Sequence, residues 1–156
     1  MPRMRTAVAS LTVALVFVWL AALSCYDIRQ RRLPNRLTLP GAGVILSAAA
    51  VAGRGLPALA GAATLAGVYL LVHLVAPAGM GAGDVKLAIG VGGLAGCFGA
   101  EVWLLAALSA PLLTALWGLG MRVAWFLGGA AGTATVPHGP SMCVATAGAA
   151  GLALLG

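Results

Sequence analysis

The sequence has 156 residues, of which 62% are hydrophobic and 8% are charged, and its mean hydropathy is +1.05. A soluble domain carries about 25% charged residues, so this composition excludes a soluble globular protein and indicates an integral membrane protein. The formal net charge of +6 does not indicate nucleic-acid binding. The few basic residues stand at the ends of apolar segments, where they orient a chain in the membrane.

The long uncharged segments predict about six membrane-spanning helices, since each crossing takes roughly 17–25 residues. We expect them near residues 6–25, 38–53, 57–76, 85–100, 102–126 and 139–155. The second is the weakest, because Gly41, Gly43 and Gly53 interrupt it. The alternation of an outer-membrane barrel is absent, and the 23 glycines favour close helix–helix packing. The sequence therefore predicts an all-α, polytopic membrane helix bundle, with residues 1–156 forming a single transmembrane domain.

The first predicted span also has the basic start and apolar core of a secretory signal. It ends in Ala22-Leu23-Ser24-Cys25, which approaches a lipoprotein cleavage box but has its leucine one place too close to the cysteine. Because further apolar spans follow, we expect this first helix to be retained.

The cysteines and histidines predict no metal site. Cys25, Cys97 and Cys143 are scattered and form no paired CxxC motif, so no zinc framework is expected. His73 lies inside an apolar span, where a hydrogen bond between helices is the expected role. His138 begins the last predicted helix and could lie near a site, but neither histidine is predicted to be catalytic.

The chain has three acidic residues, Asp27, Asp84 and Glu101. A carboxylate at the bilayer centre costs about 2.5–3.5 kcal/mol, so such groups usually face a cavity and have a function. Glu101 is predicted in a short turn, where water can solvate it. Asp27 and Asp84 each stand at the end of an apolar helix and are followed by basic residues, which makes them the candidate functional pair.

The order of the predicted spans places both aspartates on one face of the membrane, because two crossings separate them. Two carboxylates that lie close together cannot easily both ionise, so they share a proton and titrate as a pair. One member then takes a proton from water while the other donates a proton to a scissile carbonyl oxygen, as in aspartic proteases. The spacing of the two aspartates permits this arrangement.

Three glycines, Gly79, Gly81 and Gly83, precede Asp84. Glycine adopts backbone dihedrals closed to other residues and lets an extended substrate approach the main chain, so we expect an open loop here. A helix beginning at Val85 would direct its positive end toward that loop.

Two segments resemble the signatures of the type IV prepilin peptidases, polytopic aspartic proteases with a GxGD motif. They are "DIRQRRLPNRLTLP" (27–40) and "GMGAGDVKLAIG" (79–90). The first carries an aspartate, a basic stretch and Leu33-Pro34-Asn35, and the second contains Gly81-Ala82-Gly83-Asp84. A late P-F-G-P segment of many members reads Pro137-His138-Gly139-Pro140 here, with histidine in place of phenylalanine.

The resemblance implies a membrane-embedded endopeptidase that removes the short basic leader of prepilin or pseudopilin precursors. It implies Asp27 and Asp84 as the catalytic residues, without metal or cofactor, and Gly81, Gly83, Asn35 and Lys86 as residues that support the loop or bind substrate. The cysteine-rich amino-terminal extension of bifunctional members is missing, so the resemblance is to short peptidases such as those of Flp (tight-adherence) pili, and methyl transfer is in doubt. The implied location is the cytoplasmic membrane of a bacterium or archaeon, with the site on the cytoplasmic side.

The basic loop Arg29–Arg36 should repel a basic leader, so we expect it to orient the chain and to bind anionic lipid head groups. Arg29 and Lys86 either tune the aspartates or extend their charges to the membrane surface.

Three alternative classes stay open. A GxGD protease of the signal-peptide-peptidase kind would show the Tyr26-Asp27 pair, but those enzymes are longer and lack the P-N-x-L-T stretch. A small proton-coupled transporter would hold its charges near the bilayer midplane rather than at helix ends. A non-enzymatic assembly subunit is the third.

Overall fold

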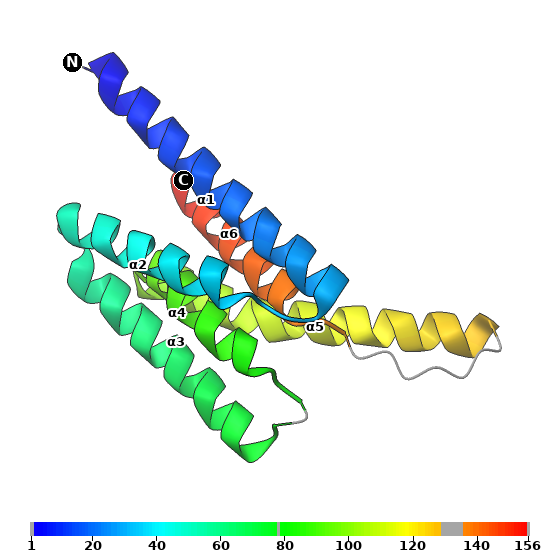
Figure 1. Ribbon diagram of the computed structural model, residues 1–156. Helices are drawn as coiled ribbons and strands as arrows, with labels where there is room; N and C mark the ends of the chain where they lie inside the picture. Colours follow the sequence, from blue (N-terminus) through cyan, green and yellow to red (C-terminus); the bar gives the residue numbers. More distant parts are fainter. Residues whose placement is uncertain (1, 78, 129–135, 156) are drawn as a thin grey trace.

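The computed structural model describes residues 2–77, 79–128 and 136–155, which form six α-helices and no strand. The helices are α1 (Pro2–Gln30), α2 (Asn35–Val51), α3 (Gly55–Val75), α4 (Ala82–Gly96), α5 (Ala100–Gly128) and α6 (Gly139–Leu155). Figure 1 shows α1 beside α6, with α2 and α3 adjacent to each other and α5 extending beyond the other helices. The all-α prediction is confirmed.

Among the described residues, three helical segments are long and apolar enough to cross a membrane: Ser10–Gln30, Gly55–Val75 and Ala100–Gly128. Helix α6 is a shorter apolar helix. Large apolar side chains such as Leu71, Leu108 and Leu152 are exposed on the outer surface, which in a membrane is the surface that contacts lipid. The molecule is thus a membrane helix bundle.

Helix α4 is the central element, because it packs against α2, α3, α5 and α6. Glycines let it approach α3 closely: a Cβ on Gly92 would lie 2.6 Å from the carbonyl oxygen of Gly61. That same carbonyl oxygen accepts a hydrogen bond of 3.0 Å from Nε1 of Trp103 on α5. Glycines thus allow close packing of α3 against α4, as the glycine content predicted.

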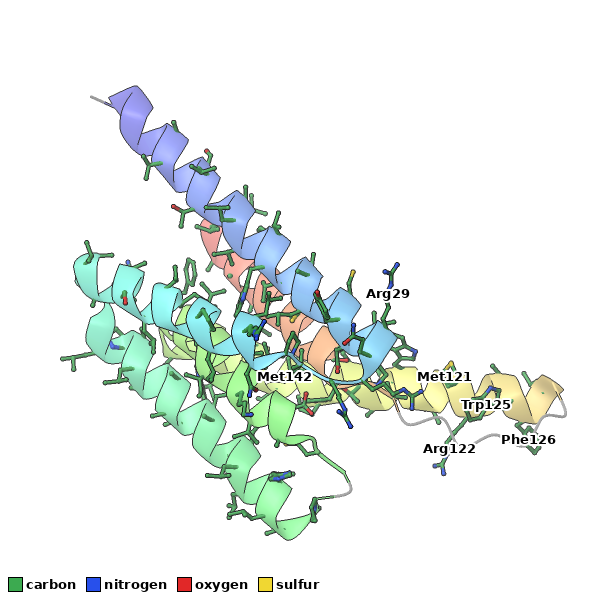
Figure 2. The ribbon with its side chains drawn as sticks, viewed as in Figure 1. Arg29, Met121, Arg122, Trp125, Phe126 and Met142 are labelled. Atoms are coloured by element: carbon green, nitrogen blue, oxygen red, sulfur yellow. The ribbon has the colours of Figure 1, made fainter. Side chains whose placement is uncertain are left out.

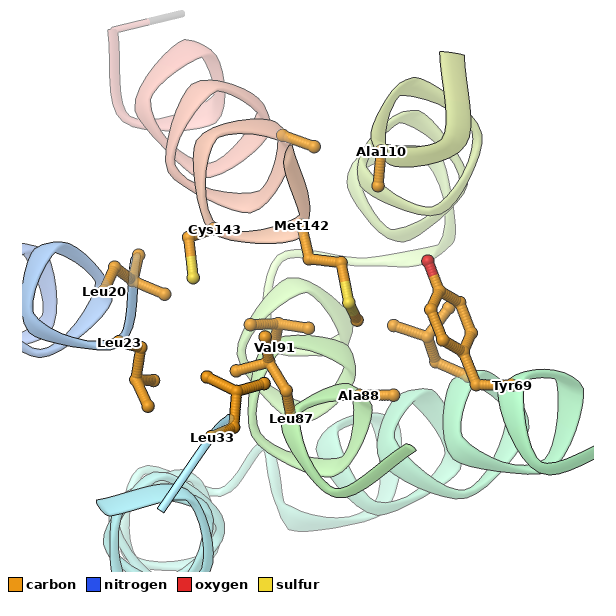
Figure 3. Packing of buried hydrophobic residues seen from close by; sticks show 12 residues of the cluster. Leu20, Leu23, Leu33, Tyr69, Leu87, Ala88, Val91, Ala110, Met142 and Cys143 are labelled. Atoms are coloured by element: carbon orange, nitrogen blue, oxygen red, sulfur yellow. The ribbon is translucent and has the colours of Figure 1, made fainter. Parts of the chain in front are cut away.

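A buried apolar layer lies next to the ends of α1 and α4 (Figure 3). Leu23 of α1 and Leu87 of α4 are almost completely inaccessible, as is Met142 of α6. Leu23 precedes Asp27 by one helical turn, and Leu87 follows Asp84 by nearly one turn, so each lies on the same helix face as its aspartate. This layer holds the two aspartate-bearing helices against α6.

Two predicted helix boundaries are wrong in a way that matters for the site. Helix α1 continues to Gln30 instead of ending near residue 25, because no helix-breaking residue intervenes. It ends where Arg31 adopts a positive φ of 49° and donates its N–H to the carbonyl oxygen of Asp27 at 2.8 Å. Helix α4 begins at Ala82 rather than Val85. Both aspartates therefore lie inside helices.

Helix α2, which the sequence predicted least firmly, is continuous through Gly41 and Gly43. Gly41 packs against the ring of Trp19 with no space for a side chain. Nε1 of Trp19 donates to the carbonyl oxygen of Leu37 at 3.0 Å, which fastens α2 to α1. Gly53, with a φ of 72°, follows the end of the helix instead of interrupting it.

Candidate active site

Asp27 of α1 and Asp84 of α4 are both buried, with exposed fractions of 7% and 8%. They line the same two cavities and interact electrostatically. The structure therefore brings the two predicted residues together at one end of the bundle, although they are 57 positions apart in the sequence (27 and 84).

Asp27 is held by the amino-terminal end of α6. Its Oδ2 accepts the backbone N–H of Gly139 at 3.0 Å, and Arg31 is close enough to interact with its charge. The start of a helix carries partial positive charge from its unsatisfied N–H groups. These contacts offset part of the cost of burying a negative charge on Asp27.

Asp84 is held by its own helix. Its Oδ2 accepts the backbone N–H of Gly81 at 3.2 Å, and its backbone N–H donates to the carbonyl oxygen of Gly81 at 3.0 Å. Gly81 is the N-cap of α4, so the carboxylate in the third helical position reaches back to the N-cap N–H, as in one half of a capping box. The G-x-G-D spacing thus produces a side-chain cap.

The expectation that these glycines adopt dihedrals closed to other residues is wrong. Gly81 has φ −75° and ψ 147°, which any residue can adopt, and the positive-φ glycines of the described chain are Gly53 and Gly99. The constraint at Gly83 is one of space, because a Cβ there would lie 3.2 Å from Cβ of Leu33. Glycine at this position allows the α1–α2 connection to approach α4 closely.

The two cavities meet at the carboxylates, since Asp27, Arg31, Gly81 and Asp84 line both. The first has a volume of about 280 Å³ and a basic wall. Its other lining residues are Arg32, Leu33, Ala82, Gly83 and Lys86. The second has a volume of about 310 Å³ and lies between the α3–α4 and α5–α6 connections. Its other lining residues are Pro77, Gly79, Met80, Val136, Pro137 and His138.

Lys86 and Asn35, predicted as supporting or substrate-binding residues, contact each other. Nζ of Lys86 donates to Oδ1 of Asn35 at 2.8 Å, which ties α4 to the start of α2 beside the first cavity. Arg29 projects from the end of α1 away from the bundle (Figure 2). Glu101 is exposed in the first turn of α5, beyond the carboxyl-terminal end of α4 and hence at the far end of that helix from Asp84.

Sequence reasoning missed the hydrogen bonds of both histidines. Nε2 of His138 lies 2.8 Å from the hydroxyl of Tyr69 on α3, and its Nδ1 lies 2.6 Å from Oγ1 of Thr114 on α5. His73 was expected to bond to another helix, but its Nδ1 lies 2.7 Å from the carbonyl oxygen of Met80, in the connection that follows its own helix. The P-H-G-P segment marked the region of His138, but no sequence signal pointed to its partners.

Burial lowers the pKa of His138, which lies in the connection before α6. The ring is therefore neutral near pH 7, with one nitrogen as donor and the other as acceptor. Within the described residues, no three His, Cys, Asp or Glu side chains gather in a metal-binding arrangement.

The fold and the site define an all-helical membrane protein with a pair of buried carboxylates at one end of the bundle. The chain belongs to the type IV leader peptidase family, whose model matches residues 14–119. The match includes both aspartates and agrees with the resemblance found in the two signature segments. It identifies the chain as a member of a peptidase family. No significant match was found among curated proteins or among solved structures.

Proposed function

We propose that the chain is an aspartic endopeptidase of the cytoplasmic membrane, formed by residues 1–156 as one domain, that removes the basic leader of type IV prepilin-like precursors. The observation that carries this proposal is the pairing of Asp27 and Asp84, which are buried together and line the same cavities. Membership of the leader peptidase family supplies the reaction class, peptide hydrolysis.

The contacts of the two carboxylates support different roles for them. Each carboxylate accepts one backbone N–H at the start of a helix, but Asp27 also lies near Arg31, so Asp27 is the more readily ionised of the two and serves as the base. Asp84 lies beside that charge, so it carries the shared proton and serves as the acid. Such a pair shares one proton because two adjacent charges repel.

The reaction follows from these roles. Asp27 takes a proton from a water molecule, whose oxygen adds to the scissile carbonyl carbon while Asp84 gives its proton to the carbonyl oxygen. The C–N bond then breaks, the leaving amine takes the proton from Asp27, and Asp84 recovers a proton from the diol. Both carboxylates return to their starting states, and one water molecule has been consumed.

The position of the site suits a substrate that is partly in the membrane. Asp27 lies in the last turns of α1 and Asp84 in the first turn of α4, so both are near the ends of apolar helices. A prepilin-like precursor has its scissile bond between a basic leader and a hydrophobic helix, and that bond would lie at the same depth. A proton-coupled transporter is less well supported, because its carboxylates would be expected near the middle of the helices.

The basic wall of the first cavity does not favour a basic leader. Arg31, Arg32 and Lys86 all line it, and we assign this wall to anionic lipid head groups at the membrane surface. The second cavity is lined by His138 and residues 79–81 and shares only Arg31 of these three basic residues, so it is the better place for the leader side of the scissile bond.

The proposal is tested by incubating membranes that contain the protein with a prepilin-like precursor and determining the new amino terminus by mass spectrometry. We expect cleavage just before the hydrophobic helix, and no cleavage with the Asp84→Asn variant. An inserted, folded protein that leaves every such precursor intact would contradict the proposal.

A further inference from the structure

The hydrogen bonds of the two aspartates come from backbone N–H groups at the starts of two helices. Gly81 donates to Asp84, and Gly139 donates to Asp27. The catalytic geometry therefore depends on where two main-chain segments lie. The α3–α4 connection contains Pro77, Gly79 and Gly81, and Gly81, the N-cap of α4, has no side chain that could accept a hydrogen bond from the first turn.

A histidine fixes the residue before Gly81, and another histidine directly precedes Gly139. Met80, directly before Gly81, offers its carbonyl oxygen to Nδ1 of His73 at 2.7 Å. A carbonyl oxygen is only an acceptor, so this Nδ1 carries the proton and donates it. The bond fastens the α3–α4 connection to the last turn of α3, one residue before the N–H that Asp84 accepts.

His138, directly before Gly139, is fixed through its own ring to two other helices. Thr114 donates its hydroxyl proton to the carbonyl oxygen of Ala110 at 3.1 Å. Its Oγ1 is therefore free to accept Nδ1–H of His138, and Nε2 accepts the hydroxyl proton of Tyr69. The ring of His138 and that of Tyr69 also pack together, with centroids 5.5 Å apart. The neutral ring that burial favours supplies the one donor and one acceptor that this arrangement needs.

We propose that His73 and His138 are positioning residues, each of which fixes the backbone N–H group that binds one catalytic aspartate. His73 acts on Asp84 through Met80 and Gly81, and His138 acts on Asp27 through Gly139. The effect on catalysis rests on the proposed function. The effect on the main chain does not, because it depends only on the hydrogen bonds that the two histidines make.

The catalytic consequence is a loss of rate with little loss of substrate affinity. A misplacement of about 1 Å in a catalytic group can cost on the order of 100-fold. We expect His138→Ala and His73→Ala each to lower kcat by about 10-fold to 100-fold while KM stays within about twofold. His138→Gln should recover part of the loss, because its side-chain carbonyl oxygen can accept the hydroxyl proton of Tyr69 in place of Nε2.

A double-mutant cycle separates hydrogen bonding from packing. His138→Phe leaves the hydroxyl of Tyr69 without its acceptor, and a buried unpaired polar group is costly. Removing both hydrogen-bonding partners costs much less than leaving one of them unpaired. We therefore expect the variant with both His138→Phe and Tyr69→Phe to be no slower than the variant with His138→Phe alone. Simple multiplication of the two single losses would contradict a shared hydrogen bond.

Helix α5 offers a matched control for the partner of His138. Thr114→Val removes the acceptor of Nδ1–H and should lower kcat, whereas Ser109→Ala, also on α5, should not. Ser109 is half-buried and donates its hydroxyl proton to the carbonyl oxygen of Leu105 on its own helix. Equal effects of the two changes would overturn the role of Thr114 and with it the role of His138.

Amide hydrogen exchange followed by mass spectrometry tests the inference without any substrate. In the purified full-length protein, His138→Ala should accelerate exchange in a peptide that covers residues 136–141 and leave residues 79–84 unchanged. His73→Ala should give the opposite pattern. Uniform acceleration in both peptides, or none in either, would overturn the proposal. If the two variants show this pattern but the wild-type protein cleaves no precursor, the proposed function fails and the positioning inference stands.

Discussion

Gly139 donates its backbone N–H to Oδ2 of Asp27 at 3.0 Å, across 112 residues of sequence. The contact leaves no space for a side chain, because a Cβ at position 139 would lie 2.6 Å from that oxygen and 3.1 Å from Cγ. The start of α6 therefore serves as one wall of the site, and the identity of residue 139 is set by the carboxylate opposite it. This explains in physical terms why a glycine follows His138 at this point of the chain.

Gly139→Ala should displace the Asp27 carboxylate and lower kcat by about 100-fold or more, the loss expected for a misplaced catalytic group. The measurement is leader cleavage under single-turnover conditions, together with thermal unfolding in detergent. Gly148→Ala is the matched control on the same helix, because a Cβ there would meet open space. Equal activity of the two variants would mean that Asp27 does not need its present position.

Asp27→Asn and Asp84→Asn should each reduce cleavage by about 10³-fold or more, because each removes one half of an acid–base pair. Combining them should cost little beyond either change alone, since groups that act as a unit show non-additive losses. Glu101→Gln should be silent, because Glu101 is exposed at the other end of α4. Near-normal cleavage by either aspartate variant would exclude the aspartic mechanism, provided that the protein is inserted.

Gly83→Val should lower activity nearly as far as the aspartate changes do. A Cβ at position 83 already approaches Cβ of Leu33 to 3.2 Å, and the added branches of valine would force the α1–α2 connection away from α4. Ala82→Val should be milder, because Ala82 is exposed. The cleavage rates of the two variants, compared at equal membrane content, provide the test. Equal tolerance at both positions would show that this segment is only a connector.

The pairing of the aspartates was predictable from the sequence because charge is costly in a membrane. Three acidic residues in 156 leave few candidates, and the order of the apolar spans placed two of them on one face. Hydropathy likewise located six helices, although α1 ends later and α4 begins earlier than predicted. Hydropathy marks where the apolar part of a span stops, whereas a helix continues until its backbone is broken.

The contacts that hold the aspartates were not predictable in the same way. Tyr69 and His138 are 69 residues apart, and helices that pack through glycine and alanine show no residue periodicity that would reveal which polar side chains meet. The glycines before Asp84 were expected to give an open backbone. In the structure Gly81 is an ordinary N-cap and Gly83 a point of close approach, a difference that depends on Leu33, from another part of the chain.

The distribution of basic residues predicts that the aspartate end of the bundle faces the cytoplasm. Six of the nine basic residues lie on that side and three on the other. The six are Arg29, Arg31, Arg32, Arg36, Lys86 and Arg122, the last of which projects from the outer part of α5 (Figure 2). The three are Arg3, Arg5 and Arg54. Arg54 donates to the carbonyl oxygen of Cys97 just beyond the carboxyl-terminal end of α4, which places it at the opposite end of that helix from Asp84.

The positive-inside rule then predicts a cytoplasmic aspartate side, which the proposed cleavage of a cytoplasmic leader also needs. Gln30→Cys, Ala82→Cys and Arg54→Cys, each in a background without the native cysteines, test this orientation, because all three positions are exposed. With an impermeant thiol reagent on intact cells, we expect position 54 to be labelled and positions 30 and 82 to react only after the membrane is opened. Labelling of 30 and 82 with protection of 54 would reverse the orientation and place the site outside. Labelling of 30 with protection of 82 would separate the two aspartates across the membrane and exclude the protease mechanism.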